Sequence, residues 1–146
     1  MRIYVPATLP LLQQWRQAGG IPSDAISYAV TAAVTAAVDG DSEEHEYAVS
    51  VLAADESLLL LAGEPDAQRR RVVVAVDAAA NEAEGALVQL SEDIAWSKVA
   101  ALLVDDVRST NLVVAAIEAA DPELLDETQL LWFAPDELDA LVAESL

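Results

Sequence analysis

The chain has 146 residues, which is enough for one ordinary domain and too few for two independent cores. Its 26 Asp and Glu residues against 7 Lys and Arg give a formal net charge of -19 at pH 7, and cysteine is absent. This composition disfavours nucleic acid and anionic membranes as partners, favours cationic ones, and excludes disulfides and catalytic thiols. Its apolar runs fall far short of the roughly 18 residues of a membrane span, and MRIYVPATLP lacks a signal-peptide pattern, so we expect a cytoplasmic protein.

The first predicted elements are a strand and a helix. Residues 2–5 alternate polar and apolar side chains and stop at Pro6, which indicates a strand. Thr8 can then cap a helix on which Leu12 and Trp15 recur near helical spacing. The helix is expected to end at Gly19-Gly20, because glycine readily adopts the left-handed backbone that follows a helix.

Segment 26–38 admits two interpretations. Its apolar residues recur at helical spacing throughout, whereas residues 26–31 taken alone have the composition of a strand. We favour a strand at Ser27–Val30, followed by a short helix that Thr31 caps and Asp39-Gly40 ends. One helix over the whole segment is the alternative.

A long helix is the most strongly indicated element of the chain. Ser42 followed by two glutamates is typical of a helix start, because the helix dipole favours acidic side chains there. The helix is expected to end at Gly63. His45, the only histidine, falls on its polar side and is expected to be solvated. One apolar stripe is expected to face the core: Tyr47, Val51, Ala54, Leu58 and Leu61.

Two fully apolar runs indicate strands that are covered on both faces. After the arginine at its start, the stretch 71–76 shows no polar alternation, and neither does 99–104, as is typical of strands at the centre of a sheet. Between them, residues 87–90 alternate and predict a shorter strand in a hairpin or meander.

The C-terminal part adds a helix, a strand and a closing helix. Ser109 or Asn111 can open the first helix, and residues 129–133 suit a last strand. After Pro135, an amphipathic helix carries Leu138, Leu141, Val142 and Leu146. Together these elements predict one α+β domain over residues 1–146, with a mixed β-sheet of about five or six strands and helices packed against it.

Three consecutive arginines, Arg69 to Arg71, precede the first apolar run. Side chains alternate along an extended strand, so Arg69 and Arg71 should point to one face and Arg70 to the other, which precludes a flat basic patch. We therefore expect a structural role, in which the guanidinium groups meet carboxylates at the strand entrance.

Both apolar runs end in carboxylates, Asp77 after the first and Asp105 and Asp106 after the second. If the two strands were parallel neighbours, these side chains would meet at one edge of the sheet and could hold hydrated Mg²⁺. With Arg108 nearby, such a site would suit phosphoryl chemistry. The simpler interpretation is that each aspartate satisfies backbone amides of a turn or helix start.

Trp132 and Phe133 are the candidates for an interaction site. Aromatic side chains are more often part of the core, because each buries a large area. Adjacent strand residues face opposite ways, however, so one of the two rings is expected to reach the surface, where it could form part of a partner-binding patch.

Six segments spread over nearly the whole chain resemble an uncharacterised family of short actinobacterial proteins: MRIYVPATL, YAVT near residue 28, EEHEYA, RRRVVVAVD, VAALLVDD and LLWFAPDEL. The resemblance implies a single domain in which residues 28–31 form a strand leading into a helix and residues 130–133 form a strand. It implies no particular activity.

The sequence favours an acidic, non-enzymatic binding or protein-interaction module that needs no cofactor. Its partner would be another protein or a second copy in a homo-oligomer. The first alternative is a small divalent-metal-dependent enzyme or nucleotide-binding protein that uses Asp77, Asp105 and Asp106 with Mg²⁺. A further alternative is an acidic antagonist that mimics nucleic acid.

Overall fold

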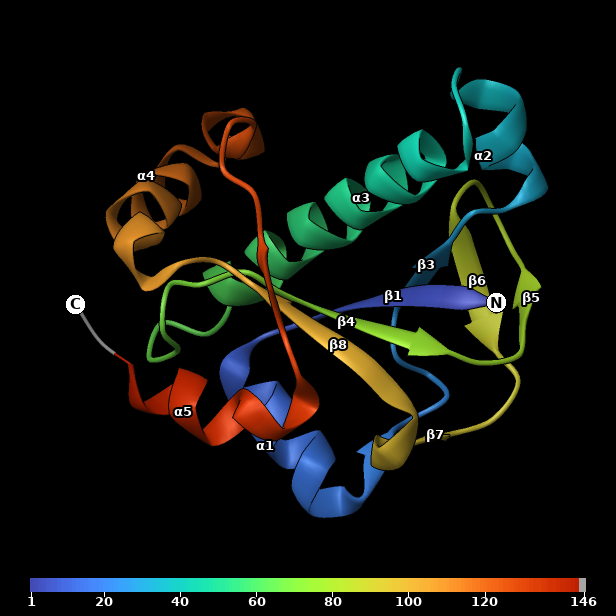
Figure 1. The fold of residues 1–146 in the computed structure, drawn as a ribbon. Helices are drawn as coiled ribbons and strands as arrows, with labels where there is room; N and C mark the ends of the chain where they lie inside the picture. The colour runs from blue at the N-terminus through green and yellow to red at the C-terminus, as the bar shows by residue number, and fades with distance from the viewer. Residues whose placement is uncertain (145–146) are drawn as a thin grey trace.

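The computed structural model describes residues 1–144 and consists of one large antiparallel sheet with helices on both faces (Figure 1). The sheet has 7 strands in the order β5-β6-β3-β1-β4-β8-β9. Their bounds are β1 Arg2–Ala7, β3 Ser27–Ala29, β4 Val72–Asp77, β5 Ala80–Glu82, β6 Leu87–Leu90, β8 Val99–Val104 and β9 Leu131–Phe133. A separate ribbon of 2 strands pairs β2 Gly20–Ile21 with β7 Ile94–Ala95.

The α-helices are α1 Leu9–Ala18, α2 Ala32–Ala37, α3 Ser42–Ala62, α4 Thr110–Ala119 and α5 Leu138–Ala143. Four 3₁₀ turns lie between the elements: η1 Trp96–Lys98, η2 Val107–Ser109, η3 Pro122–Leu125 and η4 Pro135–Glu137. The closing helix was expected to include Leu146, which lies outside the described residues. Within residues 1–144, no helix combines the length and apolar character that crossing a membrane requires.

The α+β prediction is confirmed, but the expected mixed sheet of five or six strands is wrong. Every strand pair in the large sheet is antiparallel. The two predicted runs do form central strands, although the first, β4, begins at Val72 and ends at Asp77. An unbroken apolar run indicates burial on both faces of the sheet but not the direction of the strand. Strands as short as β5, with 3 residues, offer too few positions for a sequence period to be recognised.

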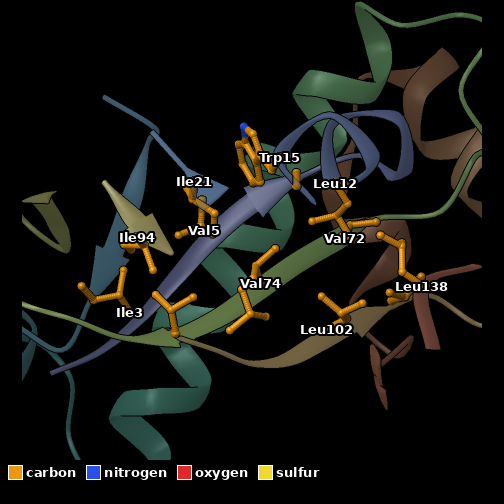
Figure 2. Packing of buried hydrophobic residues seen from close by; sticks show 14 of the residues in the cluster. Ile3, Val5, Leu12, Trp15, Ile21, Val72, Val74, Ile94, Leu102 and Leu138 are labelled. Atoms are coloured by element: carbon orange, nitrogen blue, oxygen red, sulfur yellow. The ribbon is translucent and has the colours of Figure 1, made fainter. Parts of the chain in front are cut away.

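The largest core cluster lies on the face of the sheet that α1 and α5 cover. Alternate residues of the central strands point into it, among them Val5, Val74 and Leu102, and they meet Leu12 of α1 and Leu138 of α5 (Figure 2). The ribbon of β2 and β7 closes the same cluster with Ile21 and Ile94. The opposite face of the sheet is crossed by the long helix α3 (Figure 1).

Local hydrogen-bonding residues start and stop several elements as the sequence predicts. Thr8 and Thr31 cap α1 and α2, and their hydroxyl oxygens accept from Leu11 N at 3.2 Å and Val34 N at 3.3 Å. Gly19 ends α1 in the left-handed conformation, with φ of 94°. Segment 26–38 is therefore the expected strand and helix, since β3 precedes α2.

Helix α3 buries Ala54, Leu58 and Leu61 of the predicted stripe, but other residues form most of the face that it turns to the sheet. Its most closely packed residues include Val49, Ala53 and Ser57, each 0% exposed. Ser57 is bonded to two strands, because its hydroxyl donates to Ala7 O at 2.7 Å and accepts from Val72 N at 2.9 Å. Small side chains at these positions let the helix approach the sheet closely.

Three residues of α3 contradict the predicted burial directly. Tyr47 and Val51 were expected in the core and are 53% and 37% exposed. His45 was expected in solvent and is buried, with its Nε2 lying 2.7 Å from Val38 O. Apolar residues occur around the whole circumference of α3, with Leu59 66% exposed, so helical spacing alone does not identify the face that the sheet covers.

Candidate functional site

The three predicted metal ligands are not brought together. Strands β4 and β8 are antiparallel, so Asp77 lies at one end of this strand pair and Asp105 and Asp106 at the other. A metal site shared by these three aspartates required β4 and β8 to be parallel, and this expectation is wrong. Asp77 instead lies beside Arg2, whose Nε is 2.9 Å from Asp77 Oδ1, and this hydrogen bond holds the pKa of Asp77 below its usual value.

The other two aspartates are engaged in separate ion pairs. Arg71 donates from its Nε and Nη2 to the two carboxylate oxygens of Asp105, at 2.9 and 2.8 Å, and Asp105 is 0% exposed. Asp106 accepts from Arg108, whose side-chain and backbone hydrogen bonds lower the pKa of Asp106 to about 2. Among residues 1–144, no group of three or more His, Asp and Glu side chains is arranged to hold a metal ion.

The arginine triplet binds three different parts of the fold. Arg69 donates to Leu61 O at 2.7 Å and to Glu64 O at 3.0 Å, which satisfies carbonyls at the end of α3. Arg70 reaches the opposite face of the sheet, where it donates to Leu141 O of α5 at 3.1 Å. The expected alternation and structural role agree with these contacts, although Arg69 binds backbone carbonyls and not the carboxylates that were expected.

Arg71 anchors a loop as well as a strand. Beyond its two bonds to Asp105, its Nη2 donates to Thr128 O at 3.0 Å. It thereby joins the start of β4, the end of β8 and the segment that leads into β9. Because Arg71 is 5% exposed and its hydrogen-bond partners belong to the sheet and to this segment, the segment is held at a defined distance from the sheet.

A cleft of about 410 Å³ lies between α3 and this segment. One wall is the N-terminal and middle part of α3, and it consists of Tyr47, Ser50, Val51, Ala54 and Asp55. Arg71 and Leu103 of the sheet form the base. The other wall consists of Pro122, Leu125, Asp126, Thr128, Gln129 and Leu130. Parts of the chain that are far apart in sequence thus enclose one hollow.

The cleft begins where the cover supplied by α4 ends. The C-terminal part of α3 packs against α4 in a cluster that includes Leu58, Leu61, Val113 and Ala116. Helix α4 stops at Ala119, and η3 then turns the chain away. Leu125 belongs to both this cluster and the cleft wall, so it marks the boundary between the covered and the open part of α3.

Trp132 lies next to the cleft on the edge strand. It pairs with Leu103, so strand alternation places it on the same face of the sheet as this residue of the cleft base. Its side chain is 64% exposed, whereas Phe133 points to the other face and packs against the core there. One ring of the pair therefore reaches solvent, as alternation predicts, and it does so beside the cleft.

The charged side chains of the cleft differ in whether they have a partner of opposite charge. Arg71 is engaged by Asp105 and Thr128, whereas within residues 1–144 neither Asp55 nor Asp126 forms an ion pair. Burial raises the pKa of Asp55, Arg71 acts against this effect, and the negative charge of Asp126 raises the pKa further. The cleft therefore holds two carboxylates without a cation of their own.

The sequence interpretation missed this site for a specific reason. Tyr47 and Val51 were assigned to the core, and Asp55 and Asp126 had no distinguishing motif. The available signal was that α3 is apolar on nearly all sides, because a helix that covers one sheet needs a single apolar face.

The model of a family described as "Family of unknown function (DUF6912)" matches residues 1–142. No curated protein and no solved structure matches the chain. The resemblance to an uncharacterised family is thereby confirmed, and it extends over nearly the whole length.

Proposed function

The chain belongs to this family of unknown function, and from its cleft we propose that it is a non-enzymatic interaction module that binds a partner protein. In this proposal, the partner occupies the hollow between α3 and residues 122–130 and contacts Trp132 at the rim.

The observation that carries the proposal is the convergence of exposed apolar side chains at the cleft. Tyr47 and Val51 of α3 are 53% and 37% exposed, and Trp132 of β9 is 64% exposed. They come from elements about eighty residues apart in the chain, and between them lie Leu103 and Leu130. Apolar surface gathered in this way is typical of protein interaction sites, where aromatic side chains are enriched.

Two polar side chains of the cleft, Arg71 and Ser50, are engaged in holding the fold, and within residues 1–144 the two carboxylates, Asp55 and Asp126, have no hydroxyl hydrogen-bonded to them as a nucleophile. Arg71 secures Asp105 and Thr128, and Ser50, the serine of the α3 wall, donates to the carbonyl of Tyr47 at 2.7 Å. A nucleophile in an enzyme would instead be hydrogen-bonded to a base. This arrangement supports a site that binds and does not transform its ligand.

The test is selection of peptides from a random displayed library on the full chain. Binding clones are then compared on the wild type, on Val51→Glu and on Leu59→Glu. Val51 lines the cleft, whereas Leu59, on the same helix, is 66% exposed and does not line it. We expect clones that bind the wild type and Leu59→Glu but lose binding to Val51→Glu, because the new carboxylate disrupts the apolar wall.

Trp132→Ala provides a second variant at the rim. It should weaken the same clones without unfolding the protein, since most of this side chain is already in solvent. If repeated selections yield no clone that distinguishes Val51→Glu from Leu59→Glu, the cleft is not a protein-binding site and the proposal fails.

A further inference from the structure

We propose that the occupant of the cleft is a short cationic segment of the partner protein, with a Lys or Arg side chain between Asp55 and Asp126 and an apolar neighbour on Val51 and Leu130. This inference rests on the proposed function and specifies the chemistry of the partner.

The local charges favour a cation at this position. Asp55 lies on the α3 wall and Asp126 on the opposite wall, so a side chain that enters the cleft passes between two carboxylates. Arg71 lies at the base of the cleft, but its guanidinium group already donates hydrogen bonds to the carboxylate of Asp105 and to Thr128 O. Partial burial already disfavours the charged form of Asp55, and a bound ammonium or guanidinium group would relieve this cost.

The net charge of the whole chain also favours a cationic partner. Its net charge is -19, and within the described residues five of its six arginines already pair with a carboxylate: Arg2, Arg16, Arg70, Arg71 and Arg108. Few cations are left to offset the remaining carboxylates at the surface. A basic partner is therefore attracted from a distance, whereas a second copy of this chain brings another -19 to the interface.

The size of the cleft limits what enters it. A volume of about 410 Å³ lies in the range of small-molecule sites, so it admits a few side chains and not a whole helix or domain. The apolar wall of Tyr47 and Val51 can cover an aliphatic or aromatic side chain while the neighbouring cation reaches Asp55. A short segment that combines both side-chain types fits this pattern.

The experiment uses the cleft-dependent clones, defined as those that bind Leu59→Glu but not Val51→Glu. Their sequences should be enriched in Lys or Arg next to an apolar residue, relative to the input library. A synthetic peptide from such a clone is then titrated against the wild type and the double variant Asp55→Asn/Asp126→Asn. We expect its Kd to rise about ten-fold in the double variant.

The matched control is Glu84→Gln/Glu92→Gln. It removes the same charge from exposed positions near β6, on the side of the sheet away from β9, and should leave the Kd within about two-fold of the wild type. Raising NaCl to about 0.5 M should weaken binding to the wild type more than to Asp55→Asn/Asp126→Asn.

Two outcomes overturn the inference while leaving the proposed function intact. In one, the cleft-dependent clones lack cationic residues, or their peptides bind Asp55→Asn/Asp126→Asn as tightly as the wild type. In the other, sedimentation shows a dimer that Val51→Glu dissociates, so that a second copy is the occupant. A failure to recover cleft-dependent clones would instead remove the proposed function itself.

Discussion

The two halves of α3 both carry large apolar side chains and differ in what covers them. In the C-terminal half, Leu58 and Leu61 are 5% and 0% exposed, because α4 and η3 pack over them. In the N-terminal half, Tyr47 and Val51 have no such cover and line the cleft. The same apolar character therefore supports core packing in one half and an accessible surface in the other.

The difference arises from the length of α4. This helix ends after 10 residues with Ala120 in the left-handed conformation, at φ of 51°, and η3 follows. The chain then runs along the cleft to β9, and Arg71 holds it there through Thr128. The loop of residues 122–130, held by Arg71, thus leaves the N-terminal half of α3 uncovered. Mutations in the loop anchor and in each half of α3 can therefore test the comparison between the two halves.

Breaking the buried ion pair between Arg71 and Asp105 should have the largest effect on stability. Asp105→Asn leaves the buried guanidinium of Arg71 without its charged partner, and loss of one member of a buried pair typically costs about 3–5 kcal/mol. Urea unfolding should report this loss. Asp106→Asn, which disrupts the neighbouring but solvent-exposed pair with Arg108, is the control and should cost far less. Equal costs would show that the buried pair does not anchor the loop.

Truncating the covered half should cost somewhat less. Leu61→Ala removes a fully buried side chain from the cluster between α3 and α4, and we expect the free energy of unfolding to fall by about 2–4 kcal/mol. Leu59→Ala, two residues earlier and 66% exposed, should change it by no more than about 0.5 kcal/mol. Similar losses for both variants would contradict the burial pattern of α3.

The smallest effect on the free energy of unfolding is expected for removal of the Asp55 carboxylate, which lines the cleft. Burial raises the pKa of Asp55, so the folded state binds its proton more tightly than the unfolded state does. The stability that this group contributes is present below its unfolded pKa and is lost as the pH rises through its folded pKa. Asp55→Asn should therefore stabilise the protein at neutral pH by at most about 0.5 kcal/mol, since the group is partly screened by solvent.

The pH dependence of this variant separates the burial effect from a general loss of charge. The gain of Asp55→Asn over the wild type should shrink as the pH falls through the raised pKa of Asp55 in the folded state, because the carboxyl is then protonated and uncharged. Asp66→Asn removes the same charge from an exposed site and serves as the reference. If Asp66→Asn stabilises the protein as much as Asp55→Asn at neutral pH, desolvation of Asp55 does not affect stability.

The sequence was informative wherever a structure depends on neighbouring residues. Thr8 and Thr31 cap the helices they were expected to cap, because the hydroxyl and the amide it accepts from are three residues apart. Alternation placed Arg70 on the opposite face from Arg71 and sent one ring of the Trp132–Phe133 pair into solvent. These features follow from backbone geometry over a few residues.

The tertiary structure decided which of these local features meet. Asp77 and Asp105 both end apolar strands, but the antiparallel pairing of β4 and β8 separates them, and apolar runs carry no information on direction. Likewise, His45 is buried where it contacts Val38 at the end of α2, and Tyr47 is exposed because neither the sheet nor α4 covers it. By itself, the sequence determined the longer elements, the caps of α1 and α2 and the alternation of side chains, since these are local. Strand direction, the exposed half of α3 and the cleft came only from the tertiary structure, because they depend on where distant segments of the chain return.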